Sequence, residues 1–146
     1  MSMPEARPHH RNDPQVARRL LATRARWAVV GLSQNRARVA YGIAQYLREP
    51  LGQQIVAVHP RAEEVLGAPG YATLADVPGH VDVVDVFVRS ELAGAVVDEA
   101  IAIGAGAVWL QLGVVDEAAA ARAATAGLDV VMNTCPAIEA PRLGLV

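Results

Sequence analysis

Lysine is absent from this chain of 146 residues, which also has one cysteine, 4% aromatic residues and no long apolar run. A single cysteine cannot form an internal disulfide, which favours a reducing, cytoplasmic environment. No apolar stretch approaches the roughly 18 residues that cross a membrane, and the first residues lack the apolar core of a secretory signal. A net charge of −2 with few aromatic side chains offers no basic stacking surface for nucleic acid. We therefore expect a cytoplasmic protein that binds neither membranes nor nucleic acid.

The basic residues that are present are all arginine, and most of them lie in the first half of the chain. Residues 1–61 contain ten arginines and three acidic residues, whereas residues 62–146 contain three arginines and twelve acidic residues. Because arginine can form paired hydrogen bonds with phosphate, the first half favours a phosphate-bearing ligand. GC-rich codon usage also replaces lysine with arginine, but it does not explain the clustering.

The alternation of apolar strands with amphipathic helices predicts one α/β domain over residues 13–146, preceded by a flexible tail over residues 1–12. Asp13, Ser90 and Asp116 are each expected to cap the start of a helix. The expected strands cover residues 27–30, 54–58, 81–88, 107–112 and 128–132.

We expect these strands to form a doubly wound, Rossmann-like parallel sheet of five strands, with helices on both faces. Numbered along the chain, they take the order 3-2-1-4-5, which places the strand at 81–88 on one edge. A further short strand near Tyr71 is compatible with the irregular stretch 59–80. Ligands of such sheets bind beyond the carboxyl ends of the strands. The segments at these ends are 31–38, 59–61, 87–90, 111–114 and 133–136.

The segment WAVVGLSQNRARVAYG, residues 27–42, has the strand–loop–helix order of a phosphate-binding site. Its loop is not the G-x-G-x-x-G of dinucleotide sites. Gly31 allows a tight turn, and Gly42 allows close packing on the first strand or close approach of a ligand. Arg36 and Arg38 can supply charge to a diphosphate; a plain loop with solvated arginines is the alternative. The candidate binding residues of this segment are Gly31, Leu32, Ser33, Arg36, Arg38, Tyr41 and Gly42.

The second strand ends in His59, Pro60 and Arg61, where an NAD site usually has an acidic residue that binds ribose. A cation at this position suits a ribose that carries an extra phosphate, as the riboses of NADP and coenzyme A (CoA) do. The alternative is a solvent-exposed loop without a ligand.

The third strand ends in Phe87, Val88 and Arg89. Because side chains alternate along a strand, Phe87 and Arg89 share one face. Phe87 can stack on a base, pack against an extended ligand arm such as pantetheine, or belong to the core.

The last strand is followed by NTCP, residues 133–136, which contains the only cysteine. A nucleophilic cysteine needs a base, and no histidine lies in a recognisable triad pattern. No cysteine–histidine spacing fits a metal site, the histidine doublet at 9–10 aside. We therefore expect no metal and no catalytic residue, with Cys135 structural or merely reactive. Asn133, Cys135 and Pro136 remain candidates for ligand contact.

Five segments taken together resemble the small stand-alone CoA-binding proteins of bacteria and archaea, which are relatives of the CoA-binding domain of the succinyl-CoA synthetase α subunit. They are GLSQNRARVAYG, VHPRAEEVLG, VDVVDVFVRS, EAIAIGAGAVWLQLGV and VVMNTCPAIEAPRL, and the resemblance covers residues 27–143. It implies a Rossmann-like domain with CoA lying over the strand ends. By similarity, the diphosphate loop contains Gly31, Ser33 and Arg38, and Pro60 and Arg61 match an Asn-Pro-Lys-like segment. Phe87 and Arg89 match the segment beside the pantetheine arm, and Cys135-Pro136 matches a frequent Cys-Pro.

The chain also departs from this family. Val39 and Ala40 replace a common Pro-Ser, and His59 replaces the usual asparagine. Thr134 and Ala137 replace a frequent arginine and lysine near the last strand. These changes predict weaker CoA binding or a different preferred ligand. The catalytic histidine and the ATP-grasp domain of the synthetase have no counterpart here, so the resemblance implies binding rather than thioester synthesis.

The sequence therefore favours non-catalytic binding of CoA or acyl-CoA by a monomer or homodimer whose protein partner is unknown. One alternative is an NADP-dependent oxidoreductase fragment that uses His59 and Arg61 on the 2′-phosphate. Another is an interaction or regulatory protein with a vestigial nucleotide pocket.

Overall fold

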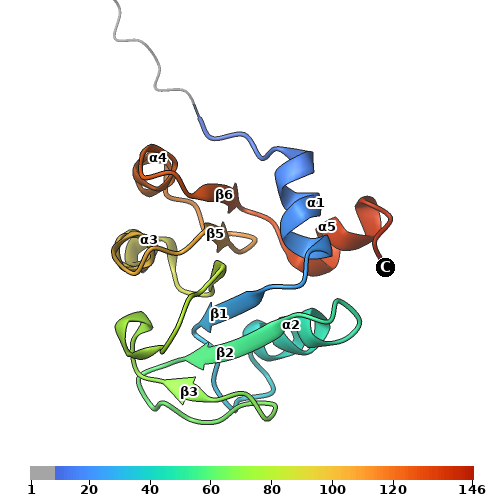
Figure 1. Cartoon of the computed structure of the whole chain (residues 1–146), viewed down its shortest axis with the longest axis vertical. Coiled ribbons are helices and arrows are strands. Elements are labelled where there is room, and N and C mark those ends of the chain that lie inside the picture. The colour runs from blue at the N-terminus through green and yellow to red at the C-terminus, as the bar shows by residue number, and fades with distance from the viewer. Residues whose placement is uncertain (1–8) are drawn as a thin grey trace, which may run out of the picture.

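Helices and strands alternate along the computed structural model, which describes residues 9–146 (Figure 1). The helices are α1 (Pro14–Ala22), α2 (Val39–Arg48), α3 (Ser90–Ala102), α4 (Glu117–Thr125) and α5 (Pro136–Arg142). The strands are β1 (Arg26–Val30), β2 (Gln54–Val58), β3 (Gly70–Tyr71), β4 (Val83–Val86), β5 (Ala107–Leu110) and β6 (Asp129–Met132). One turn of 3-10 helix, Leu74–Asp76, follows β3.

The sheet is parallel and has the order β3-β2-β1-β4-β5-β6, so the doubly wound, Rossmann-like architecture is confirmed. It contains six strands rather than five. The strand expected at 81–88 is β4, and it pairs with β1 instead of lying at the edge beside β2. β3 occupies that edge, and its two residues are too few to show a periodicity in the sequence. The chain therefore changes direction of winding between β1 and β4.

Two separate cores form because side chains alternate between the two faces of each strand. α3 and α4 cover one face, and α1, α2 and α5 cover the other (Figure 1). On the second face Trp27 of β1 and Trp109 of β5 pack together, with ring centroids 5.8 Å apart. The central strands β1 and β4 are buried between these layers, which explains their nearly continuous apolar sequences.

Helix starts agree with the sequence at two of three positions. The Asp13 carboxylate accepts a hydrogen bond from the Gln15 N–H at the start of α1, and Asp116 accepts one from the Ala119 N–H at the start of α4. Ser90 was wrongly expected to cap α3: the N-cap is Arg89. The Ser90 hydroxyl is used elsewhere, because it donates to the Gly113 carbonyl and accepts from the Val115 N–H.

Part of the expected tail is bonded to the domain. The Asn12 side-chain amide donates to the Met132 carbonyl and accepts from the Met132 N–H, both at 2.8 Å, and so extends the sheet beyond β6. The His10 N–H donates to Glu117 on α4. An edge strand has unpaired main-chain groups, and the Asn12 side chain satisfies two of them on Met132 at the end of β6. The rest of the expected tail, residues 1–8, lies outside the described residues.

Membrane crossing by a helix finds no support in residues 9–146, since none of the helices there is both long and apolar enough.

Candidate functional site

A cavity of about 910 Å³ opens at the carboxyl ends of β1, β2 and β4. Its walls are the loop after β1, the first turn of α2, the ends of β2 and β4, and the first turn of α3. Because the winding direction changes between β1 and β4, the loops that follow these strands diverge and leave a crevice. This is the position where open α/β sheets bind their ligands.

Gly31 shapes the floor of the cavity. Its φ is +103°, and an added Cβ would lie 2.6 Å from the Phe87 carbonyl oxygen. Its N–H donates to the Val58 carbonyl at 2.8 Å. The ends of β1, β2 and β4 therefore meet closely at this residue, and only glycine fits there.

The loop after Gly31 is held by its own polar side chains. The Ser33 hydroxyl accepts from the Asn35 N–H at 3.2 Å, and the Asn35 side chain accepts from the Ala37 N–H at 3.0 Å. Ser33, Asn35 and Ala37 all line the cavity. Ser33 is a candidate ligand-binding residue, and in this structure its oxygen accepts from the loop backbone.

The two helices that begin at the cavity have uncapped N-termini. Their N-cap residues are Arg38 and Arg89, and neither side chain makes a capping hydrogen bond. Asp13 and Asp116 cap α1 and α4 in the usual way. α5 also lacks a side-chain cap, but its first residue, Pro136, has no N–H to satisfy. An arginine at an N-cap offers no acceptor and opposes the helix dipole, so both helix starts are suited to an anion from outside the chain.

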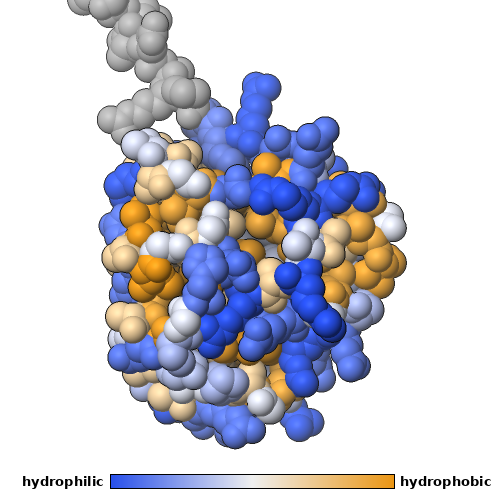
Figure 2. Space-filling view, viewed as in Figure 1, coloured by the Kyte–Doolittle hydropathy of each residue, from blue (hydrophilic) through white to orange (hydrophobic). Residues whose placement is uncertain are grey.

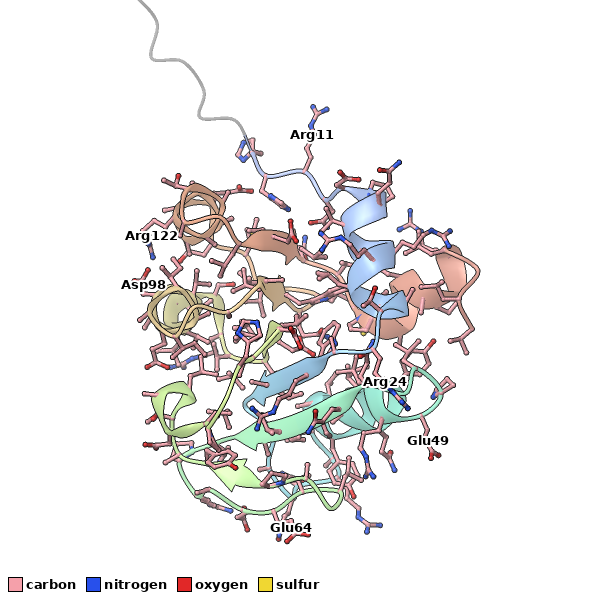
Figure 3. The ribbon with its side chains drawn as sticks, viewed as in Figure 1. Arg11, Arg24, Glu49, Glu64, Asp98 and Arg122 are labelled. Atoms are coloured by element: carbon pink, nitrogen blue, oxygen red, sulfur yellow. The ribbon has the colours of Figure 1, made fainter. Side chains whose placement is uncertain are left out.

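The arginines at the cavity have no acceptor in the part of the chain that the structure describes. Arg38, Arg61 and Arg89 line it, and within residues 9–146 none of them forms an ion pair or donates a side-chain hydrogen bond. Most other described arginines do so: Arg122 donates to Asp98 at 2.9 Å, and the two side chains point toward one another (Figure 3). The cavity therefore brings together three guanidinium groups without a protein partner in the described residues, against one acidic residue, Glu99.

His59 and Pro60 also line the cavity, beside Arg61. The His59 Nδ1 accepts from the Arg61 N–H at 3.2 Å, and the His59 carbonyl accepts from the Ala62 N–H at 2.8 Å. The histidine ring thus fixes the turn that presents Arg61. In the neutral ring the proton is on Nε2, which is the atom free to contact a ligand.

An apolar wall faces the arginines. It consists of half-buried Phe87 and Val88 together with Val39 and Leu92, which are 70% and 48% exposed. Phe87 also packs against the core, which agrees with the core alternative for this residue. Its contact with a base or a ligand arm stays a prediction. Large exposed apolar side chains at the mouth of a cavity are typical of a ligand site.

Several predicted residues do not line the cavity. The side chain of Leu32 is fully buried in the core, and Tyr41 packs against the core beneath the Arg36 guanidinium, 5.7 Å from its ring centroid. Gly42 was wrongly expected to pack on β1, because an added Cβ would meet nothing within 4 Å and the residue is exposed. Its contact with a ligand stays a prediction.

The segment after β6 lies apart from the cavity lining. Asn133 adopts φ +60°, and its side chain accepts from the Gly113 N–H at 2.8 Å, which joins the loops after β5 and β6. Cys135 is buried at the N-cap of α5, followed by Pro136 as its first residue. Ligand contact by Asn133, Cys135 and Pro136 stays a prediction.

One ionisable group is buried deep in the sheet. The Asp85 side chain on β4 is fully buried, and neither of its oxygens has a hydrogen-bond partner in the described residues. Burial raises the pKa of this carboxyl well above its ordinary value, because the charged form cannot be solvated.

No group of three or more histidine, cysteine or acidic side chains gathers at a metal-binding distance in residues 9–146.

Sequence reasoning missed part of the cavity. Val39, Leu92, Ala72 and Thr73 all line it. In the sequence Val39 and Leu92 look like ordinary helical positions. Their exposure at the cavity is evident only from the three-dimensional structure. Ala72 and Thr73 follow β3, which was too short to be placed in the sheet.

The fold and cavity together define a Rossmann-like α/β domain with a cationic crevice at the point where its winding reverses. The chain belongs to the family described as CoA binding domain, which it matches over residues 25–141. This confirms the family resemblance that the sequence motifs carry.

Relatives of similar size support the assignment. The uncharacterized protein YneT of Bacillus subtilis (strain 168) is 33% identical over 116 residues, which cover 80% of this chain and 85% of YneT. A hypothetical protein from Pyrococcus horikoshii OT3 is 36% identical with a TM-score of 0.85, covering 97% of this chain and 99% of that chain. The structure of cell-free ID.343 from Thermus thermophilus is 32% identical with a TM-score of 0.82. This match covers 90% of this chain and 99% of that chain.

Proposed function

We propose that this protein binds CoA or an acyl-CoA, without catalysing a reaction, in the cavity at the carboxyl ends of β1, β2 and β4. The observation that carries the proposal is the pairing of three free arginines with an apolar wall in one cavity. CoA has the matching chemistry, because it carries a diphosphate and a 3′-phosphate at one end and a long, weakly polar pantetheine arm at the other.

The diphosphate fits the loop after β1. There the free N–H groups at the start of α2 and the Arg38 guanidinium face the cavity. Helix N-termini and arginine are both favourable partners of phosphate oxygens.

The 3′-phosphate fits the end of β2, where Arg61 stands in place of the acidic residue of NAD sites. The pantetheine arm then follows the apolar wall formed by Phe87, Val88 and Leu92. Ser33 and His59 support a binding role, because each already accepts a hydrogen bond from the loop backbone.

The decisive experiment is calorimetric titration with CoA, acetyl-CoA, dephospho-CoA, NAD and NADPH. We expect CoA and acetyl-CoA to bind, dephospho-CoA to bind about tenfold more weakly, and the two nicotinamide nucleotides to bind weakest. One charge-assisted contact is worth about 1.5–3 kcal/mol, and each 1.4 kcal/mol is a tenfold change in affinity.

The variant Arg61→Gln tests the placement of the 3′-phosphate. It should weaken CoA about tenfold and leave dephospho-CoA unchanged, because only the missing phosphate used this arginine. Arg11→Gln is the matched control, since Arg11 is exposed and points away from the fold (Figure 3). NADPH binding without CoA binding would instead support an oxidoreductase fragment, and no binding of any ligand would support a vestigial pocket.

A further inference from the structure

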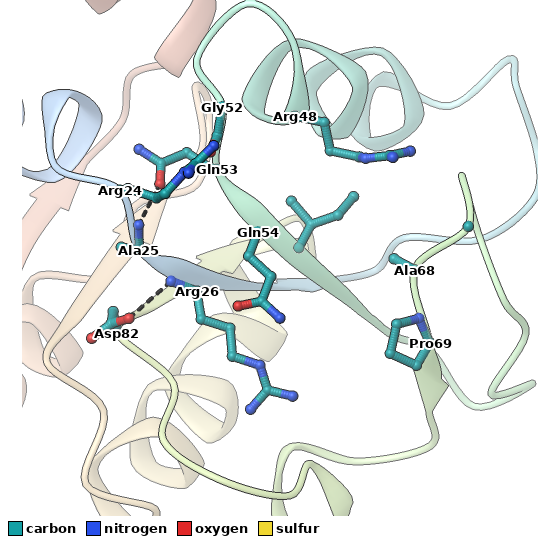
Figure 4. A pocket seen from close by; sticks show the side chains of 12 residues that line it. Arg24, Ala25, Arg26, Arg48, Gly52, Gln53, Gln54, Ala68, Pro69 and Asp82 are labelled. Atoms are coloured by element: carbon teal, nitrogen blue, oxygen red, sulfur yellow. Dashed lines mark hydrogen bonds between the residues drawn. The ribbon is translucent and has the colours of Figure 1, made fainter.

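A second cavity, of about 660 Å³, lies at the opposite end of the sheet, where β1 and β2 begin (Figure 4). It shares no lining residue with the first cavity. Three arginines line it, Arg24, Arg26 and Arg48, against a single acidic residue, Asp82. This end of the sheet therefore carries a local excess of positive charge that the proposed CoA site does not use.

Each of these arginines is held in place by main-chain carbonyls. The Arg24 Nε donates to Gly52 at 3.2 Å. Arg26 Nη1 donates to Pro78, and Arg48 Nη1 donates to Leu66. A guanidinium has five N–H donors, so most donors remain after each of these bonds. Anchoring a long side chain in advance reduces the entropy lost when a ligand binds.

The turns that hold the arginines are adapted to them. Gly52 has φ +69° and Gly79 has φ +80°. A Cβ at Gly79 would come within 3.2 Å of the Arg26 guanidinium, and one at Gly52 would lie 4.0 Å from that of Arg24. Glycine thus leaves room for a guanidinium beside each turn.

The floor of the cavity is rigid. Gln53 is 4% exposed, and its side chain accepts from the Ala25 N–H and donates to the carbonyls of Leu21 and Thr23. In the described residues Asp82 forms no ion pair with these arginine side chains: one of its oxygens accepts from the Arg26 main-chain N–H and the other lies 3.4 Å from His80.

One donor of the Arg26 side chain still lacks an acceptor. Its Nε is buried and has no hydrogen-bond partner in the described residues. A buried donor without a partner is unfavourable, and an acceptor that reaches Nε from the cavity would satisfy it.

The three arginines lie around the cavity rather than together at one point. Arg24 and Arg48 lie on one side of Gln54 and Arg26 on the other (Figure 4). Figure 2, drawn from the same side as Figure 3, shows hydrophilic residues gathered across the middle of the face on which Arg24 lies. Guanidinium groups on different sides of Gln54 can each bind a different phosphate of a chain.

We propose that this cavity, formed by Arg24, Arg26 and Arg48 around Gln54, is a second binding site that takes an oligophosphate. The ligand is either an inorganic phosphate chain or the triphosphate of a nucleotide. The site is independent of CoA binding at the other end of the sheet.

The test is a ¹⁵N NMR titration of the full chain with tripolyphosphate, ATP and citrate, in the presence of saturating CoA. We expect saturable shifts at Gly52, Gln54 and Gly67, and none at Gly31 and Ser33 of the first cavity. Equal affinity for tripolyphosphate and ATP would show that the phosphates alone are recognised, and tighter ATP binding would identify a nucleotide. Failure of CoA to bind is seen separately, as absent shifts at Gly31 and Ser33 when CoA is added.

A charge-introducing variant makes the test specific. Gln54 is exposed at the start of β2, so Gln54→Glu places a carboxylate in the centre of the cavity without disturbing the core. Tripolyphosphate affinity should fall by about tenfold or more, through repulsion at short range. Gln15→Glu is the matched control, because Gln15 is exposed on α1 outside the cavity lining and the charge change is the same.

Three results would overturn the proposal. They are no shift at Gly52, Gln54 and Gly67, equal binding of citrate and tripolyphosphate, and equal loss of affinity in Gln54→Glu and Gln15→Glu. The last two would reduce the effect to general attraction between the arginines and any polyanion.

Discussion

Gly31 and Gly42 lie in the same segment and have opposite roles. The backbone of Gly31 is left-handed and lies against the Phe87 carbonyl, whereas Gly42 is exposed in α2 with open space where a Cβ would be. In the sequence both glycines look like parts of one phosphate loop. Only the distance between the ends of β1 and β4 distinguishes them.

Replacing Gly31 and replacing Gly42 by alanine should have opposite effects on the stability of the protein. Gly31→Ala should destabilise the protein by about 2 kcal/mol or more, because the methyl group meets a main-chain oxygen in a strained conformation. Gly42→Ala should stabilise it by about 0.5–1 kcal/mol, because alanine is the better helix former. Urea unfolding of the two variants beside the parent chain measures both effects. A destabilised Gly42→Ala would contradict the open environment of this position.

At the scale of elements, α2 and α3 begin at the cavity with arginine at the N-cap, while α1 and α4 begin with aspartate. A helix start without a side-chain acceptor loses about 1 kcal/mol relative to a capped one. The two helices that face the cavity therefore have less stable ends, in a place where an anionic ligand could supply the missing acceptors.

Arg38→Asp tests this exchange of stability for binding. The backbone of Arg38 has the extended conformation of an N-cap, with φ −79° and ψ 142°, so an aspartate there can accept from the first turn of α2. The free energy of unfolding should rise by about 1 kcal/mol while CoA affinity falls at least about tenfold. Thermal unfolding and calorimetric titration measure the two quantities.

The control for that variant is Asp116→Ala at the start of α4, away from the cavity lining. It should lower stability by about 1 kcal/mol and leave CoA affinity unchanged. If Arg38→Asp kept full CoA affinity, neither the arginine nor the uncapped helix start would be part of the site.

The stability of the whole molecule depends on pH through Asp85. Its pKa is raised in the folded state, so the folded protein favours the protonated carboxyl. Above the ordinary pKa of aspartate the unfolded chain ionises while the folded chain does not. This carboxyl therefore favours folding least at high pH, and the loss levels off only above its raised pKa.

Asp85→Asn removes this titration and keeps nearly the same side-chain shape. The variant should gain stability relative to the parent as pH rises above about 4, by up to about 1.4 kcal/mol for each pH unit. Chemical unfolding of both proteins between pH 4 and pH 8 measures the difference. A difference that stays constant across this range would contradict a raised pKa for Asp85.

The sequence by itself determined the class of fold, the succession of its main elements along the chain, and the family. Apolar strands alternate with amphipathic helices, and this local pattern is sufficient because secondary structure depends on neighbouring residues. It also identified the segments that line the first cavity, including Gly31, Arg38, Arg61 and Phe87.

Only the tertiary structure decided how these segments meet. It placed β4 beside β1, turned Gly42 to solvent and used Asn12 to extend the sheet at β6. It also separated free arginines from those anchored to main-chain carbonyls. The physical reason is that pairing between strands and the choice of hydrogen-bond acceptor depend on residues far apart in the chain, as Asn12 and Met132 are, and no local pattern records such distances.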